Sequence, residues 1–141
     1  MAILQLYNSL QQLPLFQGMS NADLTNVIAH TKFDFIKVVK DKIAIREGES
    51  CTNFVFLING TLKVESISDD HSYKITETIG APSILQPERL FGLNQRYTRT
   101  FIAETDVNFM TLDKREAMKL SNDFMIFKLN LLNILSTQIQ K

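Results

Sequence analysis

The segment PERLFGLNQRYTRTFIAETD, residues 87–106, gathers charged and hydroxyl side chains in an otherwise apolar stretch of the chain. Its chemically capable side chains are Glu88, Arg89, Arg96, Tyr97, Thr98 and Arg99. Arginine holds phosphate and carboxylate groups through paired hydrogen bonds, and a carboxylate accepts hydrogen bonds from hydroxyl groups. The segment could therefore form a pocket for an anion. It could equally be a solvated loop edge, in which Glu88 pairs with an arginine for little gain in stability.

Catalysis or metal binding needs converging side chains, and the sequence offers few that could converge. His30 falls at the end of a predicted helix, where an imidazole suits the negative terminus, and His71 falls at a predicted hairpin tip. Cys51 is the one cysteine, which excludes an internal disulfide and a multi-cysteine iron–sulfur site. The glycine patterns of P-loops and dinucleotide-binding folds are absent. We expect no catalytic residue, no metal site and no enzyme activity.

Length and charge limit the class of protein further. The 141 residues, 45% of them hydrophobic, fit one domain with a sizeable core. Fifteen basic and fifteen acidic residues cancel, so these residues lack the basic surface of a nucleic-acid binder. The sequence shows no signal peptide and no apolar run of transmembrane length. We therefore expect a cytoplasmic protein that does not enter a membrane.

Short strands must position the segment 87–106, because the apolar pattern has a two-residue period across residues 32–112. The runs are FDFIKVV, KIAIREGE, NFVFLING, TLKVESIS, SYKITETIG, TRTFIAET and VNFMTLD. This spacing predicts a mainly β barrel or two-sheet roll with flanking helices. Asn59-Gly60 predicts a type I′ hairpin turn, in which both central residues need a positive φ.

Helices are predicted on both sides of the strands, in residues 1–31 and 113–141. Residues 3–13 have helical spacing until Pro14, and Ser20 is placed to cap a second helix. The C-terminal segment predicts a short amphipathic helix followed by a long helix that is apolar on nearly every side.

The long helix predicts a homodimer. One apolar stripe contains Phe124, Phe127, Leu131, Ile134 and Leu135, and a second contains Met125, Leu129, Leu132 and Ile139. One stripe can lie on the roll, and the same helix of a second copy would cover the other. A helix buried within one subunit is the alternative, but Asn130 and Asn133 are awkward for it because polar residues in helix seams set register. The expected interface residues are Phe127, Asn130, Leu131, Ile134 and Leu135.

Four stretches, LPLFQGMSNADL, IREGES, FVFLINGTLKV and FIAETDVNFMTLDKREAMKL, resemble the sensor domain of Crp/Fnr transcription regulators. The resemblance covers essentially the whole chain and implies an antiparallel jelly roll, or double-stranded β-helix, followed by a dimerisation helix. In that family the roll binds an effector, and a separate helix-turn-helix domain reads DNA. No recognition helix is present up to Lys141, so DNA binding is expected only from a domain beyond it.

The family's nucleotide site is a cassette with a Gly-Glu pair at a short helix and an Arg-Ser/Thr pair before the next strand. Counting back from Ala103 places Pro87-Glu88 on the first pair and Tyr97-Thr98 on the second. The resemblance thus implies that Glu88 and Thr98 contact a ligand. Pro87 lacks the N–H and the freedom of glycine, and Tyr97 cannot hold a phosphate as arginine does.

Two neighbouring arginines, Arg96 and Arg99, are candidates to replace the lost one. Arg96 is one position early and would point to the opposite face of an extended segment, whereas Arg99 would share the face of Tyr97. We expect no resident cofactor, and an altered or absent effector in place of a cyclic nucleotide. The two function classes left open are a regulator's sensing and dimerisation domain and a stand-alone, cupin-like small-molecule-binding roll without a role on DNA.

Overall fold

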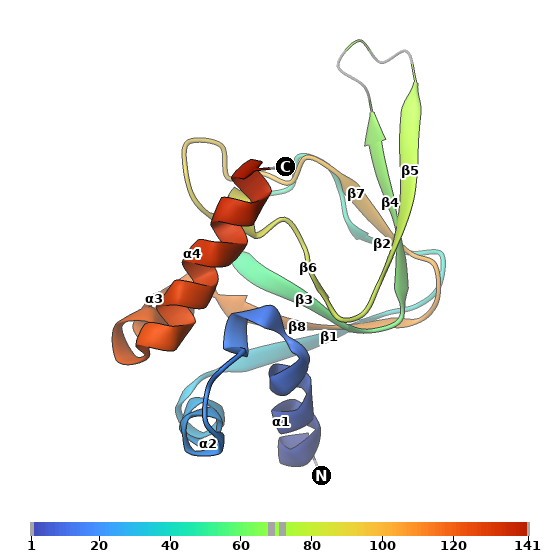
Figure 1. The fold of residues 1–141 in the computed structure, drawn as a ribbon. Coiled ribbons are helices and arrows are strands. Elements are labelled where there is room, and N and C mark those ends of the chain that lie inside the picture. Colours follow the sequence, from blue (N-terminus) through green and yellow to red (C-terminus); the bar gives the residue numbers. More distant parts are fainter. Residues whose placement is uncertain (1, 68–69, 71–72, 141) are drawn as a thin grey trace. The chain divides into compact units, whose positions relative to one another are not determined.

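The computed structural model of the chain describes residues 2–67, 70 and 73–140 (Figure 1). It divides into two compact units, a helical unit of residues 1–33 with 112–141 and a strand unit of residues 34–111. The predicted helical segments at the two ends of the chain thus belong largely to one unit.

Two four-stranded sheets form the strand unit, as the two-residue period predicted. One has the order β1 (Phe33–Val38), β8 (Val107–Asp113), β3 (Asn53–Asn59), β6 (Ser83–Ile84). The other has the order β2 (Ile43–Ile45), β7 (Thr100–Ala103), β4 (Thr61–Ile67), β5 (Lys74–Gly80). The pairings that are resolved residue by residue are antiparallel. The jelly-roll prediction is confirmed.

Alternate residues of β4 and β7 are buried, and β3 and β8 also bury neighbouring residues, which together give the roll its core. In β4 the side chains of Leu62 and Val64 are buried, whereas Lys63 between them and Glu65 after them are only partly covered. The core of the strand unit also contains Phe54, Phe56, Leu57, Leu85, Leu90, Phe101, Ala103 and Phe109. Burying each large apolar side chain contributes about 1.5–3 kcal/mol, which offsets much of the entropy lost in ordering the strands.

The predicted hairpin at Asn59-Gly60 is wrong. β3 and β4 meet at this turn but belong to different sheets, so the chain crosses between sheets there. Gly60 has a φ of 96° while Asn59 is not among the residues with positive φ. A Cβ on Gly60 would lie 2.5 Å from the carbonyl oxygen of Asp106. The glycine is required by close packing at a sheet crossing, and an Asn-Gly pair does not distinguish this turn from a hairpin.

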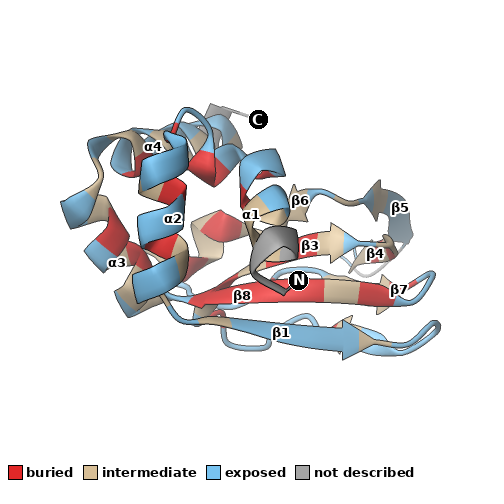
Figure 2. Ribbon diagram, turned by 90° about the horizontal axis from the view of Figure 1, so that it is seen from below, coloured by how far each residue is buried: buried red, intermediate tan, exposed pale blue. Residues whose placement is uncertain are grey.

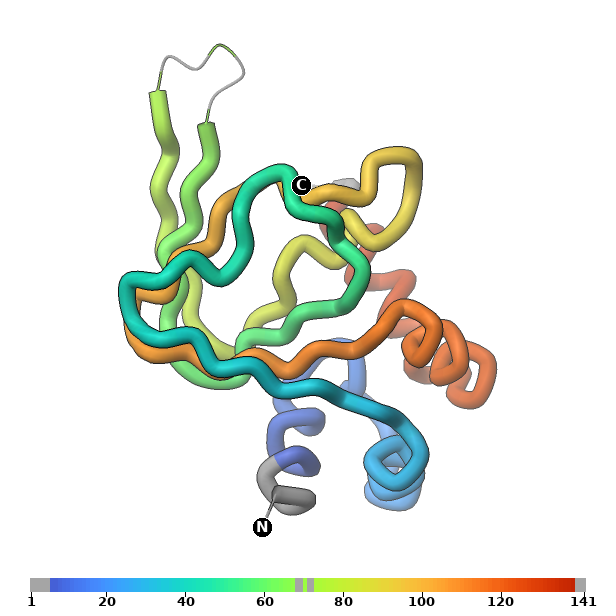
Figure 3. Tube along the Cα trace, turned by 180° about the vertical axis from the view of Figure 1, so that it is seen from behind, coloured from blue at the N-terminus to red at the C-terminus, as the bar shows by residue number. Residues whose placement is uncertain are grey.

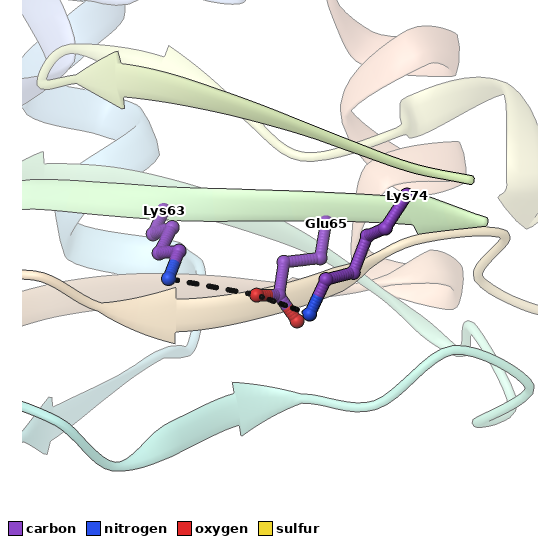
Figure 4. A network of polar contacts seen from close by, with 3 residues as sticks. All are labelled: Lys63, Glu65 and Lys74. Atoms are coloured by element: carbon purple, nitrogen blue, oxygen red, sulfur yellow. Dashed lines mark hydrogen bonds and ion pairs between the residues drawn. The ribbon is translucent and has the colours of Figure 1, made fainter.

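β4 and β5 form a long hairpin that extends beyond the neighbouring strands (Figure 1). On one face Glu65 Oε2 lies 3.6 Å from Lys63 Nζ and 3.3 Å from Lys74 Nζ, so one carboxylate joins both strands (Figure 4). The predicted tip residue His71 lies outside the described residues.

Five short elements make up the helical unit: α1 (Ala2–Gln12), η1 (Pro14–Phe16), α2 (Asn21–His30), α3 (Lys114–Asp123) and α4 (Met125–Gln140). The predicted cap is confirmed, because Ser20 Oγ accepts a hydrogen bond from the N–H of Asp23 at 3.1 Å. α4 packs on η1, where the rings of Phe16 and Phe127 meet edge to face at 5.4 Å.

Candidate functional site

The segment of residues 86–99, which we call the cassette, links β6 to β7 in the strand unit. A short 3-10 helix, η2 (Pro87–Leu90), opens it and buries Pro87 and Leu90. Gln86, just before η2, has a φ of 39° and a ψ of 59°, in the left-handed region that favours glycine. The backbone freedom of a glycine would therefore be useful at residue 86. The resemblance instead aligns the family's glycine with Pro87, one position later.

Gln86 and Thr98 close the cassette. The amide nitrogen of Gln86 donates to Thr98 Oγ1 at 2.7 Å, and the amide oxygen accepts from the N–H of Thr98 at 3.0 Å. The hydroxyl of Thr98 thus already serves as an acceptor within the chain.

A second set of contacts fastens the cassette to the turn at residues 46–51 (Figure 3). The N–H of Gly48 donates to the carbonyl of Tyr97 at 2.8 Å, and the N–H of Tyr97 donates to the carbonyl of Glu49 at 2.9 Å. Arg96 Nη1 donates to the carbonyl of Gly48 at 2.9 Å, and Arg89 Nε donates to the carbonyl of Arg96 at 2.8 Å. Both guanidinium groups therefore hold backbone oxygens.

The side chain of Tyr97 points from the cassette into the interior of the strand unit. Its side chain is 5% exposed, and its ring meets Phe101 edge to face at 6.2 Å. Burial raises the pKa of the phenol well above its ordinary value, and a side-chain hydrogen bond with Cys51 and the nearby charges of Cys51 and Glu49 raise it further. The phenol is therefore neutral, and it supplies no charge to an anion.

The side chain of Arg99 pairs with β5 and does not follow Tyr97 into the interior. Its guanidinium lies 3.7 Å from the carboxylate of Glu77 on β5, and both side chains are about half exposed. Residues 98 and 99 form a bend, so the two-residue alternation of an extended strand does not apply between Tyr97 and Arg99. The expectation that Arg99 shares the face of Tyr97 is wrong for this reason.

The side chain of Glu88 contains a buried atom whose hydrogen-bonding capacity is not used. Its Oε1 atom is buried and has no hydrogen-bond partner, and no other buried side-chain nitrogen or oxygen in the described residues lacks one. A buried carboxylate oxygen without a donor costs free energy. Glu88 can therefore accept a hydrogen bond from a hydroxyl or N–H group that the described residues do not supply.

The cassette lies inside a region that matches a known family. The model of the cyclic nucleotide-binding domain matches residues 35–123, which is more than half of the chain. The chain belongs to the cyclic nucleotide-binding domain family. No curated protein matches it.

Several solved structures share this fold at low sequence identity. The sensor domain of the transcriptional regulator DNR from Pseudomonas aeruginosa is 22% identical, with a TM-score of 0.74 over 94% of this chain and 87% of that one. The Thermus thermophilus catabolite activator protein is 14% identical, with a TM-score of 0.77 over 91% of this chain and 59% of that one.

A third similar structure is the regulatory subunit of a cAMP-independent protein kinase A from Trypanosoma brucei, solved as a triple mutant with cAMP in its A site. It is 16% identical, with a TM-score of 0.72 over 99% of this chain and 49% of that one.

The five residues predicted to bind a ligand in this cyclic nucleotide-binding domain lie in one segment, but they differ in their contacts within the chain. Thr98 is bonded to Gln86, Arg96 to Gly48, and Arg99 to Glu77. Tyr97 is buried, and Glu88 keeps a buried oxygen free of partners. The described residues contain no group of three or more histidine, cysteine or acidic side chains placed to hold a metal ion.

Sequence reasoning missed Gln86 and the contact of Cys51 with Tyr97. No local pattern marks either residue: a glutamine before a proline does not indicate a left-handed backbone, and Cys51 lies far along the chain from Tyr97. Only the strand pairing between residues 48–51 and 95–97 brings the thiol and the phenol together.

Most of the residues predicted to form the dimer interface are buried or hydrogen-bonded within the helical unit. Phe127 is fully buried and Leu131 is 6% exposed. The Nδ2 atom of Asn130 donates to the carbonyls of Leu15 and Gln17 at 3.0 and 2.8 Å. Ile134 and Leu135 are half-buried. The stripe left open on α4 is the other one, with Met125, Leu129 and Leu132 exposed. The side chain of Ile139, the fourth residue of that stripe, lies outside the described residues.

The helical unit also contains a pocket of about 200 Å³ between α2 and α3. None of the predicted ligand or dimer residues lines it; its lining comes from Asn26, Val27, His30, Thr31, Glu116, Lys119, Leu120, Asp123 and Phe124. No helix in the described part of the chain is long and apolar enough to cross a membrane.

Proposed function

We propose that the chain is the effector-sensing and dimerisation domain of a Crp/Fnr-type transcription regulator, in which the effector is altered from a standard cyclic nucleotide or absent. The family match and the fold shared with regulator sensor domains support the first part. They also favour it over a cupin-like roll. In this proposal a separate domain reads DNA, and occupation of the roll changes the arrangement of the C-terminal helices.

The buried ring of Tyr97 is the observation that carries the second part. A cyclic phosphate needs a cationic anchor inside the roll, and at the aligned position this chain has a neutral phenol packed on Phe101. The three nearby arginines are bound to Arg96 O, Gly48 O and Glu77. The Trypanosoma structure shows that a member of this fold can be described as cAMP-independent and still accept cAMP after substitution.

Dimerisation is proposed through the open stripe of α4. Three exposed apolar side chains on one side of a helix form a seam that a second copy of the same helix would cover. This replaces the interface first expected, because Phe127, Asn130 and Leu131 are occupied within the chain.

Calorimetric titration with cAMP and cGMP tests the effector proposal, using wild type, Tyr97→Arg and Tyr97→Phe. We expect no heat of binding for wild type or Tyr97→Phe at ligand concentrations that saturate a standard site. An arginine anchor is worth about 1.5–3 kcal/mol, so Tyr97→Arg should bind roughly ten- to a hundredfold more tightly than wild type. Wild-type affinity equal to that of a standard site would contradict the proposal.

A further inference from the structure

Strand β1 leaves one edge of its sheet open. β8 is its one strand neighbour in the described chain, and β1 is the first strand in the order of that sheet. Figure 2 shows β1 exposed along most of its length beside the buried β8. An edge strand presents unpaired backbone N–H and C=O groups that can pair with another strand.

Exposed apolar side chains accompany this open edge. Phe35 is 57% exposed, Ile36 is 49% exposed, and Val39 just after the strand is 49% exposed. Phe35 and Ile36 are neighbours in a strand, so they point to opposite faces of the sheet. A new strand laid along β1 would therefore meet apolar side chains on both of its faces.

Positive charge follows the same segment. Lys37, Lys40 and Lys42 are exposed, and none of them forms an ion pair within the described residues. The acidic residues of the segment are Asp34 and Asp41, which leaves a surplus of one positive charge over residues 34–42 (three lysines minus two aspartates). Asp106 beside it accepts the backbone N–H of Lys40 at 2.9 Å.

Lysine on an edge strand often serves to prevent pairing with other chains. That role accounts for Lys37 but not for an exposed phenylalanine and isoleucine beside it, which favour strand pairing. The combination of an open edge, apolar side chains on both faces and unpaired lysines selects for a strand that carries negative charge.

We propose that β1 docks an extended acidic peptide segment with apolar side chains, which adds to the sheet as a further strand next to β1. Backbone hydrogen bonds supply part of the affinity, while Phe35, Ile36 and the lysines select the side chains. A lipid surface fits less well, because it would need the apolar side chains on one face only. This inference does not depend on the effector of the roll.

An octapeptide made of two Glu-Glu-Val-Val repeats, carrying fluorescein, is the probe, because it places glutamate and valine side chains on both faces of an extended strand. We expect saturable binding to the wild-type chain by fluorescence anisotropy, with backbone amide shifts in nuclear magnetic resonance confined to residues 34–43 and the strands beside them. The same peptide with alternate amides N-methylated should not bind, because it keeps its charge and side chains but loses strand hydrogen bonds.

Two protein variants separate charge from apolar contact. Lys37→Glu with Lys40→Glu should weaken binding by roughly tenfold or more at low salt and reverse its dependence on salt, because the segment then repels the acidic peptide. Phe35→Ser with Ile36→Ser should weaken it at all salt concentrations. The matched control is Ile75→Ser on β5, which is also an edge strand with an exposed isoleucine and should bind the peptide like wild type.

Three results would overturn the proposal. The first is no binding of the glutamate–valine peptide to a folded wild-type chain. The second is equal binding of its lysine–valine counterpart or of the N-methylated peptide. The third is binding to vesicles of phosphatidylserine and phosphatidylcholine through the same lysines without any binding of the peptide, which would assign the surface to a membrane.

Discussion

Gln86 and Thr98 are joined by two hydrogen bonds through a single amide side chain, 2.7 Å to the hydroxyl and 3.0 Å from the backbone N–H. The pair spans η2 and the loop that follows it, so it fixes the two ends of the cassette to each other. It also accounts for a glutamine in a left-handed conformation, because the two bonds offset the cost of that backbone.

Replacement of Gln86 tests this closure. Gln86→Ala loses both bonds and keeps the backbone strain, and we expect a loss of about 1–2 kcal/mol in the free energy of unfolding, since the bonds are exposed. Gln86→Gly loses the same bonds but relieves the strain, so it should be the more stable of the two by about 1 kcal/mol. Urea denaturation measures both, and a less stable glycine variant would contradict the argument.

Tyr97 should make stability depend on pH in the alkaline range. Its folded pKa lies above the unfolded value of about 10, so its contribution to stability is complete below pH 10 and is lost as the pH rises beyond it. Wild type should therefore lose up to about 1.4 kcal/mol per pH unit more than Tyr97→Phe above pH 10.

Urea unfolding of wild type and Tyr97→Phe between pH 8 and 11 measures this difference. All other ionisable groups are the same in the two proteins, so their effects cancel in the comparison. Parallel pH profiles for the two proteins would show that the phenol of Tyr97 ionises in the folded state as readily as in the unfolded state.

Gly60 and Gly92 allow a comparison of the stability lost when a glycine with positive φ is replaced by alanine in a crowded place and in an open one. Both have positive φ, 96° and 85°, but a Cβ on Gly60 would meet Asp106 O at 2.5 Å and Val107 Cγ1 at 2.7 Å, whereas one on Gly92 meets nothing within 4 Å. Gly92→Ala should cost about 1–2 kcal/mol from the backbone alone. Gly60→Ala should cost at least about 2 kcal/mol more by thermal or urea denaturation, since overpacking adds to the strain.

The open stripe of α4 predicts which substitutions would dissociate the proposed dimer. Leu129→Glu with Leu132→Glu places charge in the proposed seam without removing a buried side chain, so the folded chain should sediment as a monomer. Thr137→Glu, on an exposed part of the same helix away from this stripe, is the control and should leave the mass unchanged. A monomeric wild-type chain, or a double variant that remains dimeric, would remove the proposed interface.

Much of the fold could be predicted because its signals are local. The alternation of Leu62 and Val64 with polar neighbours indicates a strand with one buried face, and Ser20 before an apolar helical pattern indicates a cap. The hairpin prediction at Asn59-Gly60 was wrong because a turn that crosses between sheets and a hairpin turn both favour glycine.

The contacts of the candidate site and of α4 could not be predicted from local sequence patterns. The bend at residues 98–99 breaks the alternation on which the placement of Arg99 depended. On α4, both stripes are apolar, so their composition does not say which one is buried; the packing of Phe127 on Phe16 decides it. In each case the deciding contact is with a residue distant in the chain.

The two hydrogen bonds from Asn130 to the carbonyls of Leu15 and Gln17 couple the C-terminal helix to the turn after α1. If α4 rotates or slides, it must either carry residues 15–17 along or break both bonds at once. The helix and this turn are therefore expected to move together, because the amide of Asn130 and the edge-to-face contact of Phe127 with Phe16 both join them.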